Sequence, residues 1–146
     1  MKKLKCDLTY ETLNWWQKFW IQIGLSCLWK HYFKQVYPQL KARDKSTEIY
    51  EAENYFPSDV VDIAEYVMQC CYENFAFGFK NFILLPNDNL ELAFCFGWDI
   101  EIIEITMDIE SKFKITIDDD KLNEMFEYNA TFLDFLNYID DLRKQK

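Results

Sequence analysis

The sequence predicts a mainly α-helical protein. Three stretches, residues 9–36, 58–74 and 99–113, carry apolar residues at the three- and four-residue steps that place them on one face of a helix. Half of the 146 residues are hydrophobic and 18% are aromatic, which excludes a disordered chain. This length suits one domain with an extension, so we expect helices packed around a single core.

The first helical stretch, residues 9–36, is hydrophobic on nearly every side. Its apolar residues are Leu13, Trp16, Trp20, Ile23 and Cys27, widened by Trp15, Phe19 and Trp29. Thr9 or Asp7 is the expected N-cap, and Gly24 is expected to mark a bend or the break of a helical hairpin. Pro38 is expected to end the helix. The preferred interpretation packs this stretch on the core. An interfacial helix on a membrane surface or a partner is the alternative, and the exposed width of its apolar face decides between them.

Charge is divided unevenly along the chain, whose net charge is −9. Residues 1–45 hold nine Lys and Arg against three acids, whereas the remainder holds seven against 22. The acidic total argues against non-specific nucleic-acid binding. The basic front and the acidic back are expected to attract each other, within one chain or between two.

Residues 41–58 are mostly charged or polar and form the expected linker. They divide the chain into a helical extension with its linker, residues 1–57, and a helical domain, residues 58–146. Ser58 is the expected N-cap of a helix that runs to about Asn74. Its inward positions are Val60, Ala64, Val67, Cys71 and Phe75, with Ile63 and Met68 beside them, and its outward positions are Asp62, Glu65, Gln69 and Glu73.

Residues 76–98 form a long connection that is too apolar for a free loop. Leu90, Leu92, Phe94 and Phe96 alternate with other residues, which is typical of a strand. A short β-hairpin within residues 79–96, in which residues 79–85 pair with that strand, is therefore an open alternative to irregular chain that folds back on the core.

Three helices are expected after Asp99. The first places Ile102, Ile105, Ile109 and Phe113 inward, Ile103 and Met107 beside them, and Glu101, Glu104, Asp108 and Glu110 outward. A short helix follows over residues 119–126. Thr131 is the expected N-cap of a last helix to about Arg143, whose inward residues are Phe132, Phe135, Leu136 and Ile139.

From residue 58 to about 142, this order of elements resembles an acyl carrier protein. The matching motifs are Gly97, Asp99 and Glu101 at the start of the 99–113 helix, Glu110–Phe113 at its end, Ile115 and Ile117 after it, Asp118–Asp120 before the short helix, and Thr131–Ile139 in the last helix. The resemblance implies an acyl-carrier-like four-helix bundle to which an aromatic-rich N-terminal helix or hairpin has been added.

The sequence departs from this family at the residue that carries its chemistry. The family has Gly-x-Asp-Ser-Leu, whose serine bears 4′-phosphopantetheine, whereas residues 97–101 read Gly-Trp-Asp-Ile-Glu. The serine position falls on Ile100, or on Asp99 if one residue is deleted, and neither has a hydroxyl group. The nearest hydroxyl, on Thr106, lies about two turns into the helix. The resemblance therefore implies the scaffold without the cofactor, as in serine-less, uncharacterised bacterial acyl-carrier-like proteins.

The resemblance also implies a binding surface, because the acidic second helix of acyl carrier proteins recognises basic patches on partner enzymes. Glu101, Glu104, Asp108 and Trp98 are the corresponding candidates here. We expect a non-enzymatic protein that binds a partner through this helix. The alternatives are a genuine carrier modified at an atypical site, and a membrane or interaction protein that uses Trp15, Trp16, Phe19 and Trp20; a membrane surface is the less favoured partner.

No pattern of residues predicts catalysis or a metal site. His31 is the only histidine, and the five cysteines are irregularly spaced. Adjacent Cys70 and Cys71 are expected to be packed thiols rather than a redox pair, which suits a reducing cytoplasm. The acidic run Asp118–Asp120 lacks the glycine and terminal glutamate of an EF-hand loop. The apolar run Phe19–Trp29 is too short to span a bilayer.

Overall fold

The computed structural model describes residues 1–8, 10–23, 28–46, 49–75, 78–94 and 99–145, and their regular structure is helical. In chain order the elements are η1 (Tyr10–Thr12), α1 (Trp15–Gln22), α2 (Leu28–Asp44), η2 (Ala52–Asn54), α3 (Val61–Asn74), α4 (Leu90–Phe94), α5 (Asp99–Phe113), α6 (Asp119–Glu127) and α7 (Phe132–Lys144). The prediction of a mainly helical protein is confirmed. Within this part of the chain, no helix combines the length and apolar character needed to cross a bilayer.

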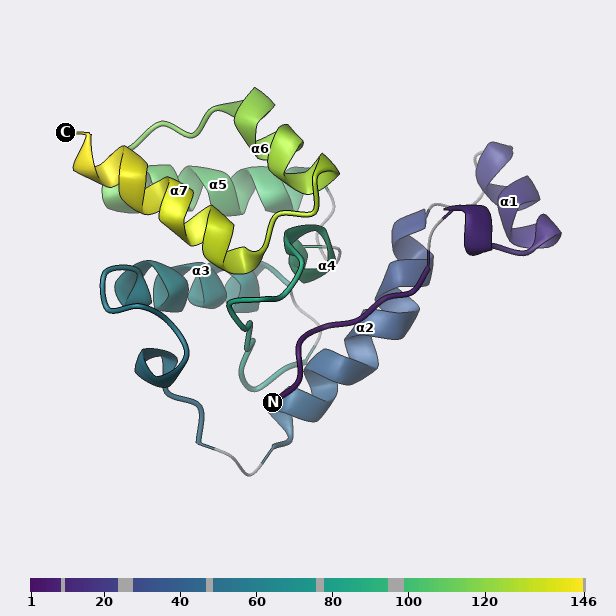
Figure 1. Ribbon diagram of the computed structural model, residues 1–146. Coiled ribbons are helices and arrows are strands. Elements are labelled where there is room, and N and C mark those ends of the chain that lie inside the picture. The colour runs from purple at the N-terminus through teal and green to yellow at the C-terminus, as the bar shows by residue number, and fades with distance from the viewer. Residues whose placement is uncertain (9, 24–27, 47–48, 76–77, 95–98, 146) are drawn as a thin grey trace.

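The helices from α3 onward form a bundle (Figure 1). Helix α3 packs against α5 and α7, and the short α4 packs against α6 and α7. The predicted inward positions of α3 and α7 are all buried: Val60, Ile63, Ala64, Val67, Met68, Cys71, Phe75, Phe132, Phe135, Leu136 and Ile139. Ile105 and Ile109 of α5 join the same core, with Ile102 and Phe113 packed at its edge. Spacing alone therefore identified the core face of α3 and α7 and the centre of the core face of α5.

Helix α7 begins with the expected cap and ends with paired charges. The Thr131 hydroxyl accepts a hydrogen bond from the backbone N–H of Asp134, whose carboxylate accepts one from the N–H of Thr131. This capping box satisfies N–H groups that the first helical turn leaves unpaired. At the other end, Arg143 and Lys144 both pair with the buried carboxylate of Asp140. These contacts lower the pKa of Asp140, the hydrogen bond from Lys144 contributing most.

Helix α3 begins later than predicted. Residues 58–60 form a turn, and Val60 takes the N-cap position without any side-chain hydrogen bond, so the assignment of Ser58 as the cap is wrong. Val60 is fully buried, and its N–H donates to the carbonyl of Pro57. Burial of an apolar side chain and a backbone turn thus determine the start of α3 where a polar cap was expected.

The segment from Gly78 to Phe94 contains no strand among its described residues, so the proposed β-hairpin is wrong. Leu90, Leu92 and Phe94 instead belong to α4, whose apolar residues are buried on every side. The Asn89 side chain accepts a hydrogen bond from the N–H of Leu92, which starts the helix. Alternation was misleading because a short helix that is buried all round shows no polar face.

Two expectations about the N-terminal region are also wrong. Pro38 lies inside α2, which continues to Asp44 because Leu40 and Arg43 are buried beyond it. The expected linker, residues 41–58, therefore starts within a helix. The predicted break at Gly24 falls in residues 24–27, which lie outside the described part of the chain.

A buried ion pair joins this region to the bundle. The guanidinium of Arg43 donates to both carboxylate oxygens of Asp88, at 2.6 and 2.8 Å. It also donates to the carbonyls of Ile83 and Lys2, while Asp88 accepts from the N–H groups of Leu4 and Leu85. The guanidinium thereby donates four hydrogen bonds and both carboxylate oxygens are paired, as a buried ion pair requires. The pair holds the N-terminal segment, α2 and the 83–88 loop together.

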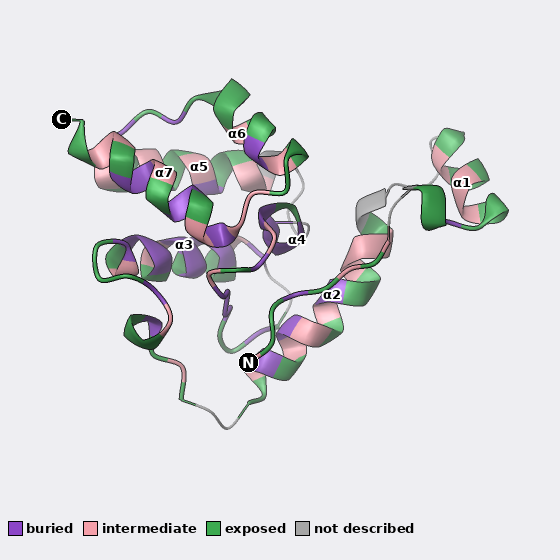
Figure 2. Ribbon diagram, in the orientation of Figure 1, coloured by how far each residue is buried: buried purple, intermediate pink, exposed green. Residues whose placement is uncertain are grey.

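Helix α1 differs from the other long helices because no residue within it is buried (Figure 2). Leu13, just before it, is buried as predicted, but Trp16, Trp20 and Ile23 are exposed. The preferred interpretation, which packed this stretch on the core, is wrong for α1. In Figure 1 the helix lies at the opposite end of the molecule from α5.

Candidate functional site

The outward face of α5 is the predicted binding surface, and the structure places only part of the predicted set on it. Glu104 and Asp108 lie one turn apart and are exposed, as expected. We call these two residues the acidic strip. The hydroxyl of Tyr66, on α3, donates to the carbonyl of Asp108, so this strip borders α3. Trp98 lies outside the described residues.

Glu101 and Glu110, which were also predicted to face outward from α5, are turned toward the protein. A carboxylate oxygen of Glu110 accepts a hydrogen bond from the N–H of Ile117 at 2.7 Å, which holds the chain as it leaves the helix. Glu101 is half-buried, and its Oε2 has no hydrogen-bond partner among the described residues. The acidic face is therefore narrower than the sequence indicated.

An apolar strip lies beside the acidic strip. Ile103 and Met107 are 57% and 61% exposed, although the sequence placed them at the edge of the core. They too lie one turn apart, on the side of the helix that borders α6. Two large exposed apolar side chains next to two carboxylates form a mixed surface that is typical of a binding site.

A groove of about 570 Å³ extends this surface between α5 and α6. Its walls are Ile102, Ile103, Thr106, Met107, Glu110, Asp119, Leu122, Asn123 and Phe126. Apolar side chains predominate, and carboxylates stand at Glu110 and Asp119. Sequence reasoning missed the groove because it exists only where α6 lies against α5. In the sequence, only the four-residue spacing of Leu122 and Phe126 could have indicated the groove. Both side chains are half-buried in the structure.

The two positions that were predicted to correspond to the serine of acyl carrier proteins open α5. Asp99 is the first residue of the helix and Ile100 is the second. The nearest hydroxyl, on Thr106, donates to the carbonyl of Ile102 at 2.8 Å and is half-buried. This hydroxyl is engaged in the helix, so an attached phosphodiester would have to displace that bond.

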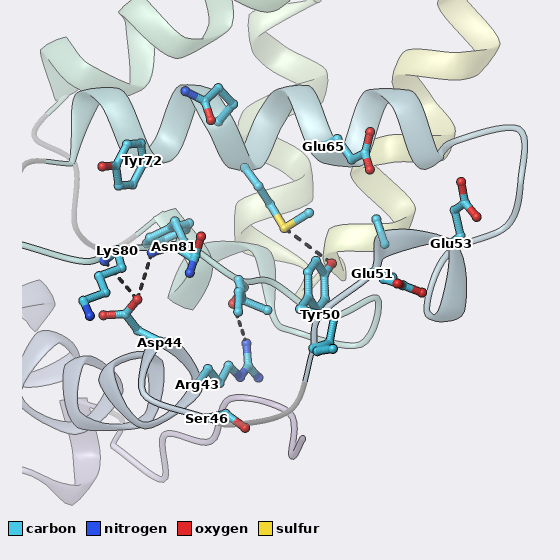
Figure 3. Close-up of a pocket in the computed structure, with 16 residues that line it drawn as sticks. Arg43, Asp44, Ser46, Tyr50, Glu51, Glu53, Glu65, Tyr72, Lys80 and Asn81 are labelled. Atoms are coloured by element: carbon cyan, nitrogen blue, oxygen red, sulfur yellow. Dashed lines mark hydrogen bonds between the residues drawn. The ribbon is translucent and has the colours of Figure 1, made fainter.

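A second hollow, of about 800 Å³, lies between the end of α2, η2 and α3 (Figure 3). Its polar groups hold the structure together. Asp44 accepts from the N–H groups of Lys80 and Asn81, and Tyr50 donates to the carbonyl of Leu84. Burial opposes ionisation of Asp44, but these N–H donors and Lys41 outweigh it and lower its pKa. Burial raises the pKa of Tyr50. Neither group is placed as an acid–base pair, so we assign this hollow no chemistry.

The adjacent thiols of Cys70 and Cys71 are likewise packing groups. Burial raises the pKa of Cys70 to about 11 and that of Cys71 well above its usual range, so both thiols stay protonated and unreactive at neutral pH. Burial and the neighbouring charge of Lys34 lower the pKa of His31. Among the described residues, no three metal-ligating side chains cluster.

Comparison of the chain with models of protein families, with curated proteins and with solved structures gave no match.

Proposed function

We propose that this protein is a non-enzymatic, acyl-carrier-like protein that lacks the phosphopantetheine serine and binds a partner protein through α5. The proposal joins the resemblance of residues 58–142 to the geometry of α5. One observation carries it: Ile103 and Met107 are exposed beside the carboxylates of Glu104 and Asp108. A helix that only kept the protein soluble would not expose two large apolar side chains on the same face.

The chemistry of the surface specifies the partner. An apolar side chain of the partner fits the α5–α6 groove, while its Lys and Arg residues face the acidic strip. Ile103 and Met107 are 57% and 61% exposed, so their full coverage would contribute roughly 1–2 kcal/mol each. The carboxylates contribute mainly to the rate of association and to the choice of partner. Affinity therefore depends on the apolar strip and specificity on the acidic strip.

A genuine carrier, modified at an atypical residue, is the competing function. The engaged hydroxyl of Thr106 and the side chains at positions 99 and 100 weigh against it. Intact mass after incubation with coenzyme A and a phosphopantetheinyl transferase separates the two. We expect no change in mass. An increase equal to the phosphopantetheine arm would overturn the proposal.

The binding surface is tested by capture of cytoplasmic proteins on the immobilised full chain. The variants are Glu104→Lys with Asp108→Lys, and Ile103→Ser with Met107→Ser. Each pair should lower recovery of the same basic partner at least about tenfold. Glu51→Lys with Glu53→Lys is the matched control, because it changes the charge equally at exposed positions near η2. Equal recovery by all three variants would remove the α5 surface from consideration.

A further inference from the structure

Helix α1 turns a continuous aromatic face to solvent. Its members, which we call the aromatic face, are Trp15, Trp16, Phe19, Trp20 and Ile23, exposed by 67%, 60%, 37%, 43% and 48%. At 100° per residue they span an arc of about 140° around the helix axis. Their rings contact one another: Trp15 stacks on Phe19 at 5.8 Å between centroids, and Phe19 meets Trp20 edge-on at 5.5 Å. The face is therefore an ordered surface.

The opposite side of α1 lies toward η1 and carries polar groups beside Ile21. Gln17, Lys18 and Ile21 are half-buried there, and the Lys18 ammonium donates to the carbonyl of Glu11. The side chains of Asn14 and Gln17 form a capping box that sets the start of the helix. A surface helix ordinarily turns its larger apolar side inward, and α1 turns it outward. In the part of the chain that the structure describes, the aromatic face is left exposed.

Two basic residues lie close to α1. Lys30 and Lys34 are exposed on the first turns of α2, the end of that helix nearest α1 (Figure 1). Lys2 and Lys5 lie beside the other half of α2, where the Lys2 carbonyl accepts from Arg43 and Lys5 pairs with Gln39. These lysines supply positive charge in a protein whose net charge is −9. A binding partner that complements the aromatic face and the lysines has an apolar interior and a negatively charged surface.

We propose that the aromatic face of α1 docks on an anionic lipid surface. Indole rings favour the boundary between lipid tails and water, because their apolar body and polar N–H suit both sides. Lysines beside them attract anionic headgroups. A second copy of the chain is a poorer occupant, since pairing of two aromatic faces would bring Lys30 and Lys34 of both molecules together.

The arrangement of α2 keeps the acidic bundle away from the lipid charge. Val36 is the first buried residue among those of α2 whose exposure is described, eight residues after its start at Leu28. At 1.5 Å per residue, about 12 Å of helix separate the two positions. This separation weakens the repulsion between the acidic bundle and an anionic surface. Lys30 and Lys34 lie on the stretch of α2 before Val36.

Co-flotation of the full chain with vesicles tests the proposal. The probes are vesicles of phosphatidylcholine alone and of equal parts phosphatidylcholine and phosphatidylglycerol. The protein is expected to float with the anionic vesicles at low salt and to be released as salt rises. Trp15→Ser, Trp16→Ser and Trp20→Ser are each expected to lower the partition coefficient roughly tenfold. Circular dichroism should show unchanged thermal unfolding, because none of these side chains is buried.

Ile103→Ser with Met107→Ser is the matched control, since it removes exposed apolar side chains from α5 and should leave flotation unchanged. Lys30→Glu with Lys34→Glu should weaken it. Absence of flotation with anionic vesicles at low salt would overturn the proposal, and so would flotation that survives the triple tryptophan variant. The result would be different if the protein did not float but formed dimers without lipid, as measured by light scattering. If the variant with all three tryptophans replaced were then a monomer, the face would be assigned to a second copy instead. None of these outcomes bears on capture through α5, which is tested separately.

Discussion

Helices α1 and α7 begin with the same kind of N-terminal cap but lie in opposite surroundings. Each starts with a capping box, from Asn14 and Gln17 in α1 and from Thr131 and Asp134 in α7. Each then carries large apolar residues on one face. In α7 this face is buried, whereas in α1 it is exposed. The residues that start and form a helix therefore do not determine whether its apolar face is buried. An ordered apolar face that stays exposed is typical of a binding surface.

The difference arises from contacts distant in sequence. The last turn of α7 is tied to the start of α3, where the Arg143 guanidinium donates to the Asp62 carboxylate at 2.6 Å and to the Asp59 carbonyl at 2.9 Å. The hydrogen bonds described for α1 instead join residues at most seven positions apart, such as Lys18 and Glu11. The bundle is held by its core, and α1 is held by its neighbours along the chain.

Loss of a core side chain from α7 should produce the largest effect. Phe132 is fully buried and meets Phe56 edge-on at 5.7 Å, so Phe132→Ala should lower the free energy of unfolding by about 3–5 kcal/mol. Trp16→Ala, a change of similar size in α1, should alter it by less than about 0.5 kcal/mol. Chemical denaturation of both variants measures the contrast. Equal losses would mean that α1 packs on the bundle in solution.

Loss of the buried ion pair should have the second-largest effect, because this pair joins the region that carries α1 to the bundle. Arg43→Met leaves the buried Asp88 carboxylate without its cation, and we expect a loss of about 3 kcal/mol. This is the lower end of the usual range, since the N–H groups of Leu4 and Leu85 still donate to Asp88.

Replacement of both partners by apolar residues, Arg43→Met with Asp88→Leu, should recover part of the loss, as it does for buried pairs in general. Lys121→Ala is the control, because it breaks the exposed pair with Glu124 and should cost about 0–1 kcal/mol. A similar cost for Arg43→Met and Lys121→Ala would show that the buried pair does not join the two regions.

Removal of the N-caps of α1 and α7 should have the smallest effect on stability. Thr131→Ala should lower the free energy of unfolding by about 1 kcal/mol, since α7 belongs to the cooperative core. Asn14→Ala should leave global unfolding unchanged, while amide hydrogens of α1 exchange faster. Hydrogen exchange by mass spectrometry resolves the two regions. A global loss for Asn14→Ala would contradict the independence of α1.

Much of the bundle was predictable because its helices have one polar and one apolar face. The inward positions of α3 and α7 and the cap at Thr131 follow from spacing within a few turns. Helix α4 was missed because it has no polar face, and the end of α2 was misplaced because Pro38 usually stops a helix. The Arg43–Asp88 pair joins residues 45 positions apart, and no local pattern marks it.

The candidate site was predicted in part for the same reason. Exposure of Glu104 and Asp108 follows from helical periodicity. The apolar strip and the α5–α6 groove depend on how far α6 covers α5, which no spacing rule reports. The inward turn of Glu110 depends on Ile117, beyond the end of the helix.

Residue types and local spacing are enough to predict that the chain is helical, which face of α3 and α7 is apolar, and that residues 97–101 hold no serine. These properties depend on neighbours within one or two turns. Coverage of the apolar faces follows from the fold, because burial is set by contacts between residues distant in the chain. These contacts leave the aromatic face of α1 and the apolar strip of α5 at the surface.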